Sequence, residues 1–213
     1  MRGLTVAAQA PDLEHASAEG VLRYAVEQHH PRLVVASSFQ KESSVIIDMV
    51  LRIEPATRFV TIDTGVLFEE THAARRAIEE RYGIEIEAYD ASAPDGGTWT
   101  ADRCCGDYKV AALRRALGDA EAWVTGLRRE HSPERANTAK VHWDERNGLW
   151  KVAPLADWSE RDVWRYIAEH DVPYNELHDK GYDSIGCVPC TLPGAGREGR
   201  WAGTDRTECG LHG

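Results

Sequence analysis

The stretch Arg32-Leu-Val-Val-Ala-Ser-Ser38 decides the fold, because a short apolar run ending in small polar residues is typical of a buried strand. The helix predicted next, over residues 42–53, carries its apolar side chains on one stripe: Val45, Ile46, Met49, Val50 and Ile53. A strand followed by a helix is the repeating unit of an α/β sheet. The serine-rich turn between them, residues 37–44, is therefore expected at the carboxyl end of a parallel strand, where such sheets bind ligands.

The same alternation continues along the chain. Further strands are predicted over residues 58–63, 84–89 and 121–125, and further helices over residues 68–82, 104–117 and 159–170. Asn147-Gly148 joins residues 141–143 and 150–152 in a predicted hairpin. We expect an α/β fold with a mostly parallel sheet and flanking helices. One domain would span residues 1–195, and residues 196–213 would form a flexible C-terminal tail.

Composition narrows the class of protein. The chain of 213 residues has a formal net charge of -10, whereas binding to nucleic-acid backbones depends on clustered Lys and Arg. No apolar run approaches the roughly 20 residues that span a bilayer, and the N-terminus lacks the apolar segment of a secretory signal. We therefore expect a cytoplasmic protein with neither nucleic-acid nor membrane partners.

Polar residues follow the predicted strands at the edge where a ligand would bind. Helix N-termini attract anions, serine hydroxyls add donors, and guanidinium groups bind oxyanions bidentately. Taken singly, each segment is equally an ordinary turn or a solvated loop; together they indicate a nucleotide or small-oxyanion site. The residues predicted to bind substrate here are Ser37, Ser38, Ser43, Asp63, Thr64, Gly126, Arg128 and Arg129.

The chain has five cysteines, which a cytoplasmic protein keeps reduced. Cys187-Val-Pro-Cys190 has the spacing of ligands to zinc or to an iron–sulfur cluster. The adjacent pair Cys104-Cys105 is cramped around a single zinc, but in a cluster each thiolate reaches its own iron. We expect these four to hold a [4Fe–4S] cluster. Lys109, on the same helical face as Cys105, would offset its negative charge.

The fifth cysteine, Cys209, lies near the end of the chain, where segments are mobile unless tied down. Arg206 and His212 are close enough in sequence to favour its thiolate, the reactive form. The pattern favours a nucleophile over an idle exposed thiol.

Three groups of residues, in this order along the chain, resemble the assimilatory sulfonucleotide reductase family. They are the four paired cysteines, the loop of residues 125–136 (the arginine loop) with its His131-Ser-Pro133, and the terminal Glu208-Cys-Gly-Leu-His212. The resemblance runs from about residue 32 to residue 212 and implies an adenine nucleotide α-hydrolase-like fold. The serine turn is similar to a modified pyrophosphatase loop but lacks its glycines, which argues against ATP chemistry.

The resemblance implies an activity. Members with the paired cysteines generally use adenosine 5'-phosphosulfate (APS), and members without them the 3'-phosphorylated form (PAPS). An APS reductase is therefore expected, in which Cys209 attacks the sulfur and thioredoxin or a similar dithiol frees sulfite from the S-sulfonate. The resemblance also assigns substrate binding to Arg197 and Arg200, and catalytic roles to Lys109 and His212 beside Cys209. The cluster is expected to act by charge and scaffolding, not by cycling electrons.

Other functions stay open at this stage. A PAPS reductase is the nearest. An enzyme that thiolates RNA is disfavoured by the acidic charge and the missing glycine-rich loop, and a zinc-stabilised binding module would make Cys209 incidental. The sequence leaves a homo-oligomer open.

Overall fold

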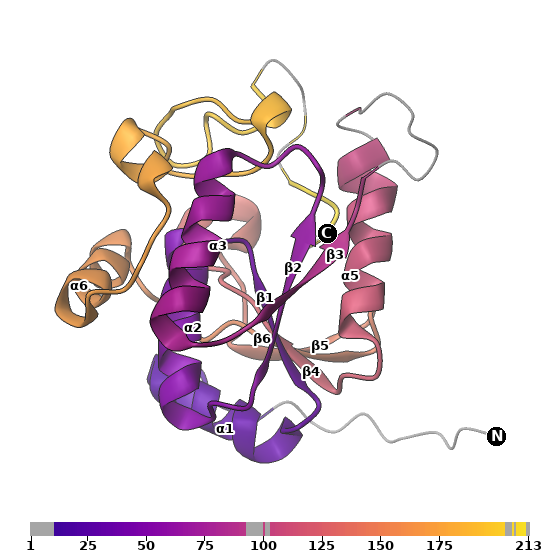
Figure 1. Ribbon diagram of the computed structural model, residues 1–213. Helices are drawn as coiled ribbons and strands as arrows, with labels where there is room; N and C mark the ends of the chain where they lie inside the picture. The colour runs from indigo at the N-terminus through magenta and orange to yellow at the C-terminus, as the bar shows by residue number, and fades with distance from the viewer. Residues whose placement is uncertain (1–10, 93–99, 101–102, 203–205, 207, 212–213) are drawn as a thin grey trace.

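Six strands form one sheet in the order β3-β2-β1-β4-β6-β5 (Figure 1). The computed structural model describes residues 11–92, 100, 103–202, 206 and 208–211. All neighbouring strands run parallel except β5 and β6, which form an antiparallel hairpin. The predicted α/β class, the mostly parallel sheet and the hairpin are confirmed. The strands are β1 (Leu33–Ser37), β2 (Arg58–Asp63), β3 (Ile86–Asp90), β4 (Ala122–Val124), β5 (Val141–Asp144) and β6 (Leu149–Val152).

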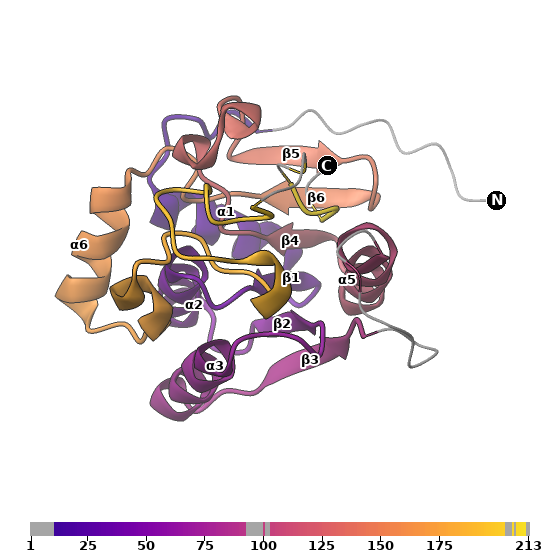
Figure 2. The same ribbon diagram turned by 90° about the horizontal axis from the view of Figure 1, so that it is seen from above.

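Helices cover both faces of the sheet (Figure 2). Side chains alternate along a strand, so Leu33 and Val35 of β1 pack into one apolar core and Val34 into the other. The first core includes residues from α1 (Ala18–His29), α2 (Lys41–Ile53), α3 (Glu69–Tyr82) and α6 (Glu160–His170). The second is closed by α5 (Lys109–Leu117).

Local sequence sets several helix ends. At the start of α6 the Ser159 hydroxyl accepts the Asp162 N–H (3.2 Å) and the Asp162 carboxylate accepts the Ser159 N–H (3.0 Å). Gly83 ends α3 with a φ of 64°, a left-handed conformation that glycine adopts without strain. Helix α1 was not predicted, although Ser17 caps it and its apolar side chains are buried on one face.

The predicted helix over residues 104–117 is built differently from the expectation. A π-helical turn, Cys104–Tyr108, precedes the regular helix α5. π-turns inside helices occur frequently at functional sites. Here the wider turn carries the cysteine pair and buries both thiols.

The segment after α6 is mostly irregular, with short 3₁₀ turns at Glu176–Lys180 and Val188–Cys190. It passes over the carboxyl ends of the parallel strands, at the top of Figure 1. The Gln40 side-chain oxygen accepts the Ile185 N–H (2.8 Å), which joins this segment to the serine turn. Among the described residues, no helix has the length and apolarity needed to cross a membrane.

Candidate active site

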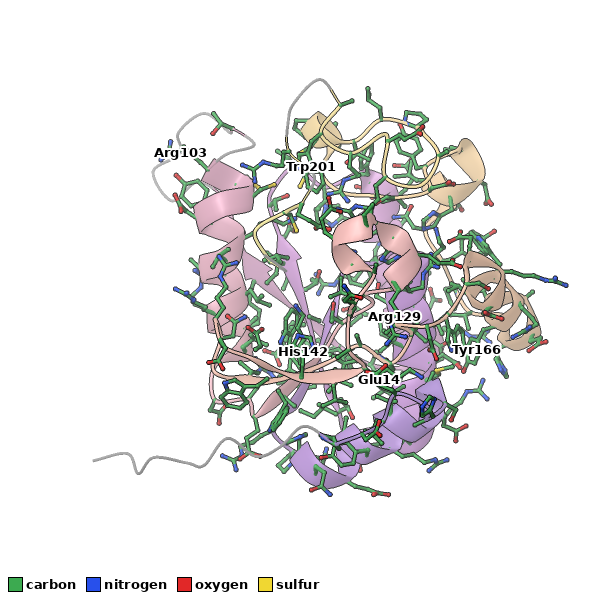
Figure 3. The ribbon with its side chains drawn as sticks, turned by 180° about the vertical axis from the view of Figure 1, so that it is seen from behind. Glu14, Arg103, Arg129, His142, Tyr166 and Trp201 are labelled. Atoms are coloured by element: carbon green, nitrogen blue, oxygen red, sulfur yellow. The ribbon has the colours of Figure 1, made fainter. Side chains whose placement is uncertain are left out.

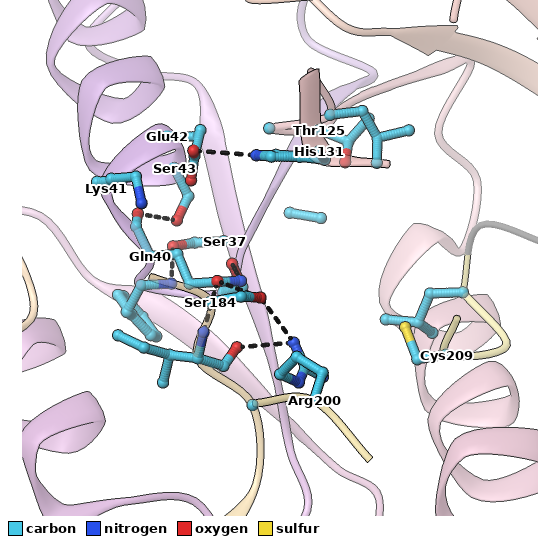
Figure 4. A pocket seen from close by; sticks show the side chains of 18 of the residues that line it. Ser37, Gln40, Lys41, Glu42, Ser43, Thr125, His131, Ser184, Arg200 and Cys209 are labelled. Carbon is cyan, nitrogen blue, oxygen red and sulfur yellow. Dashed lines mark hydrogen bonds and ion pairs between the residues drawn. The ribbon is translucent and has the colours of Figure 1, made fainter. Parts of the chain in front are cut away.

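A pocket of about 340 Å³ opens at the carboxyl ends of the strands, a size usual for small-molecule sites. The serine turn lines one side, and Cys209 faces it from the other side (Figure 4). Nine of the predicted site residues line this pocket: Ser37, Ser38, Ser43, Lys109, Gly126, Arg128, Arg197, Arg200 and Cys209.

The serine turn is held in one conformation. Buried Phe39 has a φ of 55°, and its N–H is accepted by the Ser37 hydroxyl (3.2 Å). The Ser43 hydroxyl donates to the Gln40 carbonyl (2.9 Å) at the start of α2. A non-glycine residue in the left-handed region is strained and persists only where its surroundings enforce it, which is common at binding sites.

Arg128 lies in the pocket wall, but its guanidinium is already bonded within the protein. It donates to carboxylates of Glu42 (3.0 Å), Glu130 (3.1 Å) and Glu160 (2.6 Å), and to the Trp158 carbonyl (3.2 Å). These four hydrogen bonds use four of the five donors of an arginine. The arrangement fits a residue that holds β4, α2 and α6 together around the pocket.

Glu42 and His131 complete this buried network. Burial alone would raise the pKa of Glu42, but the hydrogen bond to His131 and the charges of Lys41 and Arg128 hold it well below its usual range. His131 Nδ1 faces two donors, the Arg128 N–H (3.2 Å) and the Arg135 guanidinium (3.0 Å). Its proton therefore lies on Nε2, which donates to Glu42 (3.1 Å). Burial lowers the pKa of His131, which keeps the ring neutral.

Three predicted binding residues do not line the pocket. Arg129 forms an ion pair with Glu14 (Figure 3) and donates to the Thr138 carbonyl (3.0 Å). Asp63 closes its own turn by accepting the Gly65 N–H (2.8 Å). Thr64 is buried with its hydroxyl 3.2 Å from the Cys187 sulfur, so it faces the cysteines and not a ribose or phosphate. His212 lies outside the described residues.

Arg200 and Arg197 both lie over the Trp201 ring, with guanidinium carbons 4.4 and 5.4 Å from the ring centroid. Arg200 donates to the Ser184 hydroxyl (3.2 Å) and the Ile185 carbonyl (3.1 Å). It lies against Gly186, where an added Cβ would be 2.5 Å from Arg200 Nη2. Burial and the neighbouring charge of Arg135 lower the pKa of Arg197 to about 10, so it stays protonated at neutral pH.

The four paired cysteines come from two segments that are distant in the sequence. All four are buried, and Cys105, Cys187 and Cys190 pack together with Trp201. Bonds from Cys104 and Cys190 lower the pKa of Cys105 and Cys187, while the pKa values of the two donors are raised. In the described part of the chain, no three His, Cys, Asp or Glu side chains are grouped to hold a single metal ion.

Lys109 joins the cysteines to the pocket. Its burial would lower its pKa, but the negative charge of Cys209, Cys187 and Cys105 raises it, so the ammonium stays protonated. Half-buried Cys209 packs against the cluster of Cys105, Cys187, Cys190 and Trp201. A thiol, an ammonium group and two guanidinium groups therefore share one cavity.

Several residues of the pocket wall were not predicted as site residues. Elements that are far apart in the sequence place these residues in the pocket wall, so no local pattern connects them. A charged residue at the start of a helix usually indicates only a solvated first turn. The arginine-loop motif was the one available signal, for His131 and Arg135. The residues missed are Gln40, Lys41, Glu42, His131, Arg135, Glu160, Ser184 and Trp201.

Comparisons with known proteins agree with this geometry. The model of the phosphoadenosine phosphosulfate reductase domain matches residues 32–193. The chain belongs to this family. An adenosine 5'-phosphosulfate reductase of Bacillus pumilus is 41% identical over 219 residues, covering 96% of this chain and 94% of the relative. One of Salinibacter ruber is 39% identical, covering 91% and 83%. A phosphoadenosine 5'-phosphosulfate reductase of Gloeobacter violaceus is also 39% identical, covering 93% and 90%.

Solved structures of the family and of its fold are similar too. The phosphoadenylyl-sulfate reductase of Candida auris, in a phosphate complex, has a TM-score of 0.68 and 30% identity, covering 84% of this chain and 94% of that one. An FMN adenylyltransferase of Candida glabrata has a TM-score of 0.63 at 17% identity, covering 84% and 65%. The second likeness bears on the fold alone and confirms the expected adenine nucleotide α-hydrolase-like architecture.

Proposed function

We propose that this protein is an assimilatory, thioredoxin-dependent APS reductase that forms sulfite and AMP through an S-sulfonate on Cys209. The observation that carries the proposal is the shared pocket: the tail cysteine lines the same cavity as Lys109, Arg197 and Arg200. The relatives named adenosine 5'-phosphosulfate reductase support this substrate. Thioredoxin is proposed as the reductant because the chemistry needs a dithiol, and the other four cysteines are proposed to be cluster ligands.

The first step transfers the sulfo group. The Cys209 thiolate attacks the sulfur of APS, an S–S bond forms, and the bond from sulfur to the bridging phosphate oxygen breaks. The electron pair leaves on that oxygen as AMP departs. Lys109, Arg197 and Arg200 would offset the charge that develops on the phosphate, which is electrostatic stabilisation of the transition state.

The second step needs two electrons from outside the chain. A thiolate of the dithiol attacks the Cys209 sulfur, and sulfite leaves with the electron pair of the S–S bond. The second thiol then resolves the mixed disulfide and restores Cys209. This order requires Cys209 to face the pocket in one step and a protein partner in the next, so the tail is proposed to move.

The four buried cysteines are proposed to hold a [4Fe–4S] cluster. The donor set fits such a cluster, because it consists of four cysteine thiols. The Thr64 hydroxyl lies beside Cys187. When bound, the cluster supplies charge and a rigid scaffold. Lys109, held among the same sulfur atoms, would carry positive charge from that region toward the substrate.

A PAPS reductase is the second candidate, favoured by the similarity to the Gloeobacter violaceus protein. Sulfite release from APS and from PAPS, measured side by side on anaerobically purified protein with thioredoxin, decides between them. Turnover of APS with little from PAPS supports the proposal, and the reverse preference overturns it. Cys209→Ser should abolish sulfite release while iron and labile sulfide are retained; continued turnover would eliminate Cys209 as the nucleophile.

A further inference from the structure

The residue before Cys209 is anchored by charge. The Glu208 carboxylate accepts two hydrogen bonds from the Arg135 guanidinium, at 2.7 and 2.8 Å, and forms an ion pair with Arg197 at 3.2 Å. All three side chains are largely buried, with exposed fractions of 20% for Glu208, 11% for Arg135 and 15% for Arg197. A bidentate, charge-assisted pair that is shielded from water is among the stronger polar contacts in proteins.

The residue after Cys209 is anchored through its backbone. The Gly210 N–H donates to the Cys105 carbonyl (2.9 Å), and the Gly210 carbonyl accepts from Arg146. The approach is so close that a Cβ on Gly210 would lie 2.3 Å from the Cys105 oxygen. A backbone oxygen cannot move aside as a flexible side chain does, so only glycine fits at this position.

We propose that Glu208 and Gly210 are positioning residues that clamp the tail on both sides of Cys209 and aim its sulfur into the pocket. The inference rests on the proposed role of Cys209 as the nucleophile. With both neighbours held, the backbone of Cys209 has little freedom, and its side chain has a single rotatable bond to the sulfur. The clamp thereby sets the distance and angle of attack without touching the substrate.

Charge explains why the first anchor is a carboxylate. Arg135 and Arg197 carry like charges at one edge of the pocket, and the charge of Arg135 already lowers the pKa of Arg197. Glu208 offsets that repulsion, so seating the tail also stabilises the arginine pair. Arg200 and Lys109 remain beside the pocket to meet the substrate oxyanion.

The test compares Glu208→Gln and Gly210→Ala with the wild-type protein and with Glu198→Gln, a control at an exposed glutamate of the same segment. The first assay is single-turnover S-sulfonation of Cys209 by saturating APS without dithiol, followed by mass spectrometry. A displacement of about 1 Å can cost about 100-fold in rate, so we expect about 100-fold loss for Gly210→Ala. For Glu208→Gln we expect a loss of roughly tenfold.

The second assay needs no substrate. Iodoacetamide should alkylate Cys209 several-fold faster in both variants than in the wild type or the control, because the tail is released. In steady state the loss should fall on kcat, with the KM for APS raised no more than about twofold. Arg146→Ala, a surface change, repeats the test of the second anchor if Gly210→Ala does not fold.

Unchanged S-sulfonation and unchanged alkylation in both variants would overturn the clamp. A raised KM with normal kcat would also overturn it, since Glu208 would then act on substrate binding. Sulfite release by Cys209→Ser would instead overturn the proposed nucleophile, so the two ideas fail separately.

Discussion

Replacing Arg128 with methionine tests whether this arginine holds the site together or binds the substrate. The exposed fractions are 4% for the Arg128 side chain and 6% for that of Glu42, so their ion pair is almost free of solvent. Methionine keeps much of the volume and removes all donors. Glu42 would then be left buried, with His131 and Lys41 as its remaining partners.

The magnitude follows from that burial. Breaking a buried pair by removing one partner costs about 3–5 kcal/mol of unfolding free energy. The contacts to Glu130 and Glu160 add little, because these carboxylates are 55% and 46% exposed. In a protein of this size about 1 kcal/mol shifts Tm by roughly 2–4 °C, so a fall of about 6–20 °C is expected.

Two readouts are needed. The first is thermal unfolding followed by circular dichroism. The second is APS turnover, measured about 15–20 °C below the midpoint of each variant so that the protein stays folded during the assay. Arg165→Met is the matched control, since Arg165 pairs with Asp162 at the surface and should cost less than about 1 kcal/mol. An Arg128→Met protein that is as stable as the control but has a strongly raised KM would refute the reasoning. The Arg128 guanidinium of the wild-type protein would then bind the substrate.

Three other changes have expected outcomes. Gly186→Ala should displace the Arg200 guanidinium, raising the KM for APS by roughly tenfold with little change in Tm; an unchanged KM would contradict this placement of Arg200. Thr64→Val removes the hydroxyl beside Cys187 and should speed iron loss to a chelator by about tenfold, and equal rates would contradict its supporting role. Burial lowers the pKa of four histidines below 6.5, so the unfolded chain binds more protons below that pH. The unfolding midpoint should be highest above about pH 6.5 and fall toward about pH 5, where a rising midpoint would contradict the sign; the histidines are His29, His131, His142 and His178.

Local patterns in the sequence were enough for the architecture. Apolar runs ending in small polar residues predicted the parallel strands. The helix predicted over residues 159–170 begins where Ser159 and Asp162 cap α6, and capping is a contact between near neighbours. The spacing within each cysteine pair singled out four candidate ligands, and the terminal motif pointed to Cys209. These features depend on residues a few positions apart, so they can be read along the chain.

Tertiary structure decided how the predicted residues are used. Arg128 and Arg129 are neighbours in one motif, yet one bonds to Glu42 inside the pocket wall and the other to Glu14 outside it. Thr64 turned toward Cys187 because a segment 123 positions away folds against it. Partners of this kind come from elements far apart in the sequence and are set by packing. The sequence by itself therefore determined the fold class and the chemically active residue types, whereas the division between binding, positioning and supporting residues depends on three-dimensional contacts.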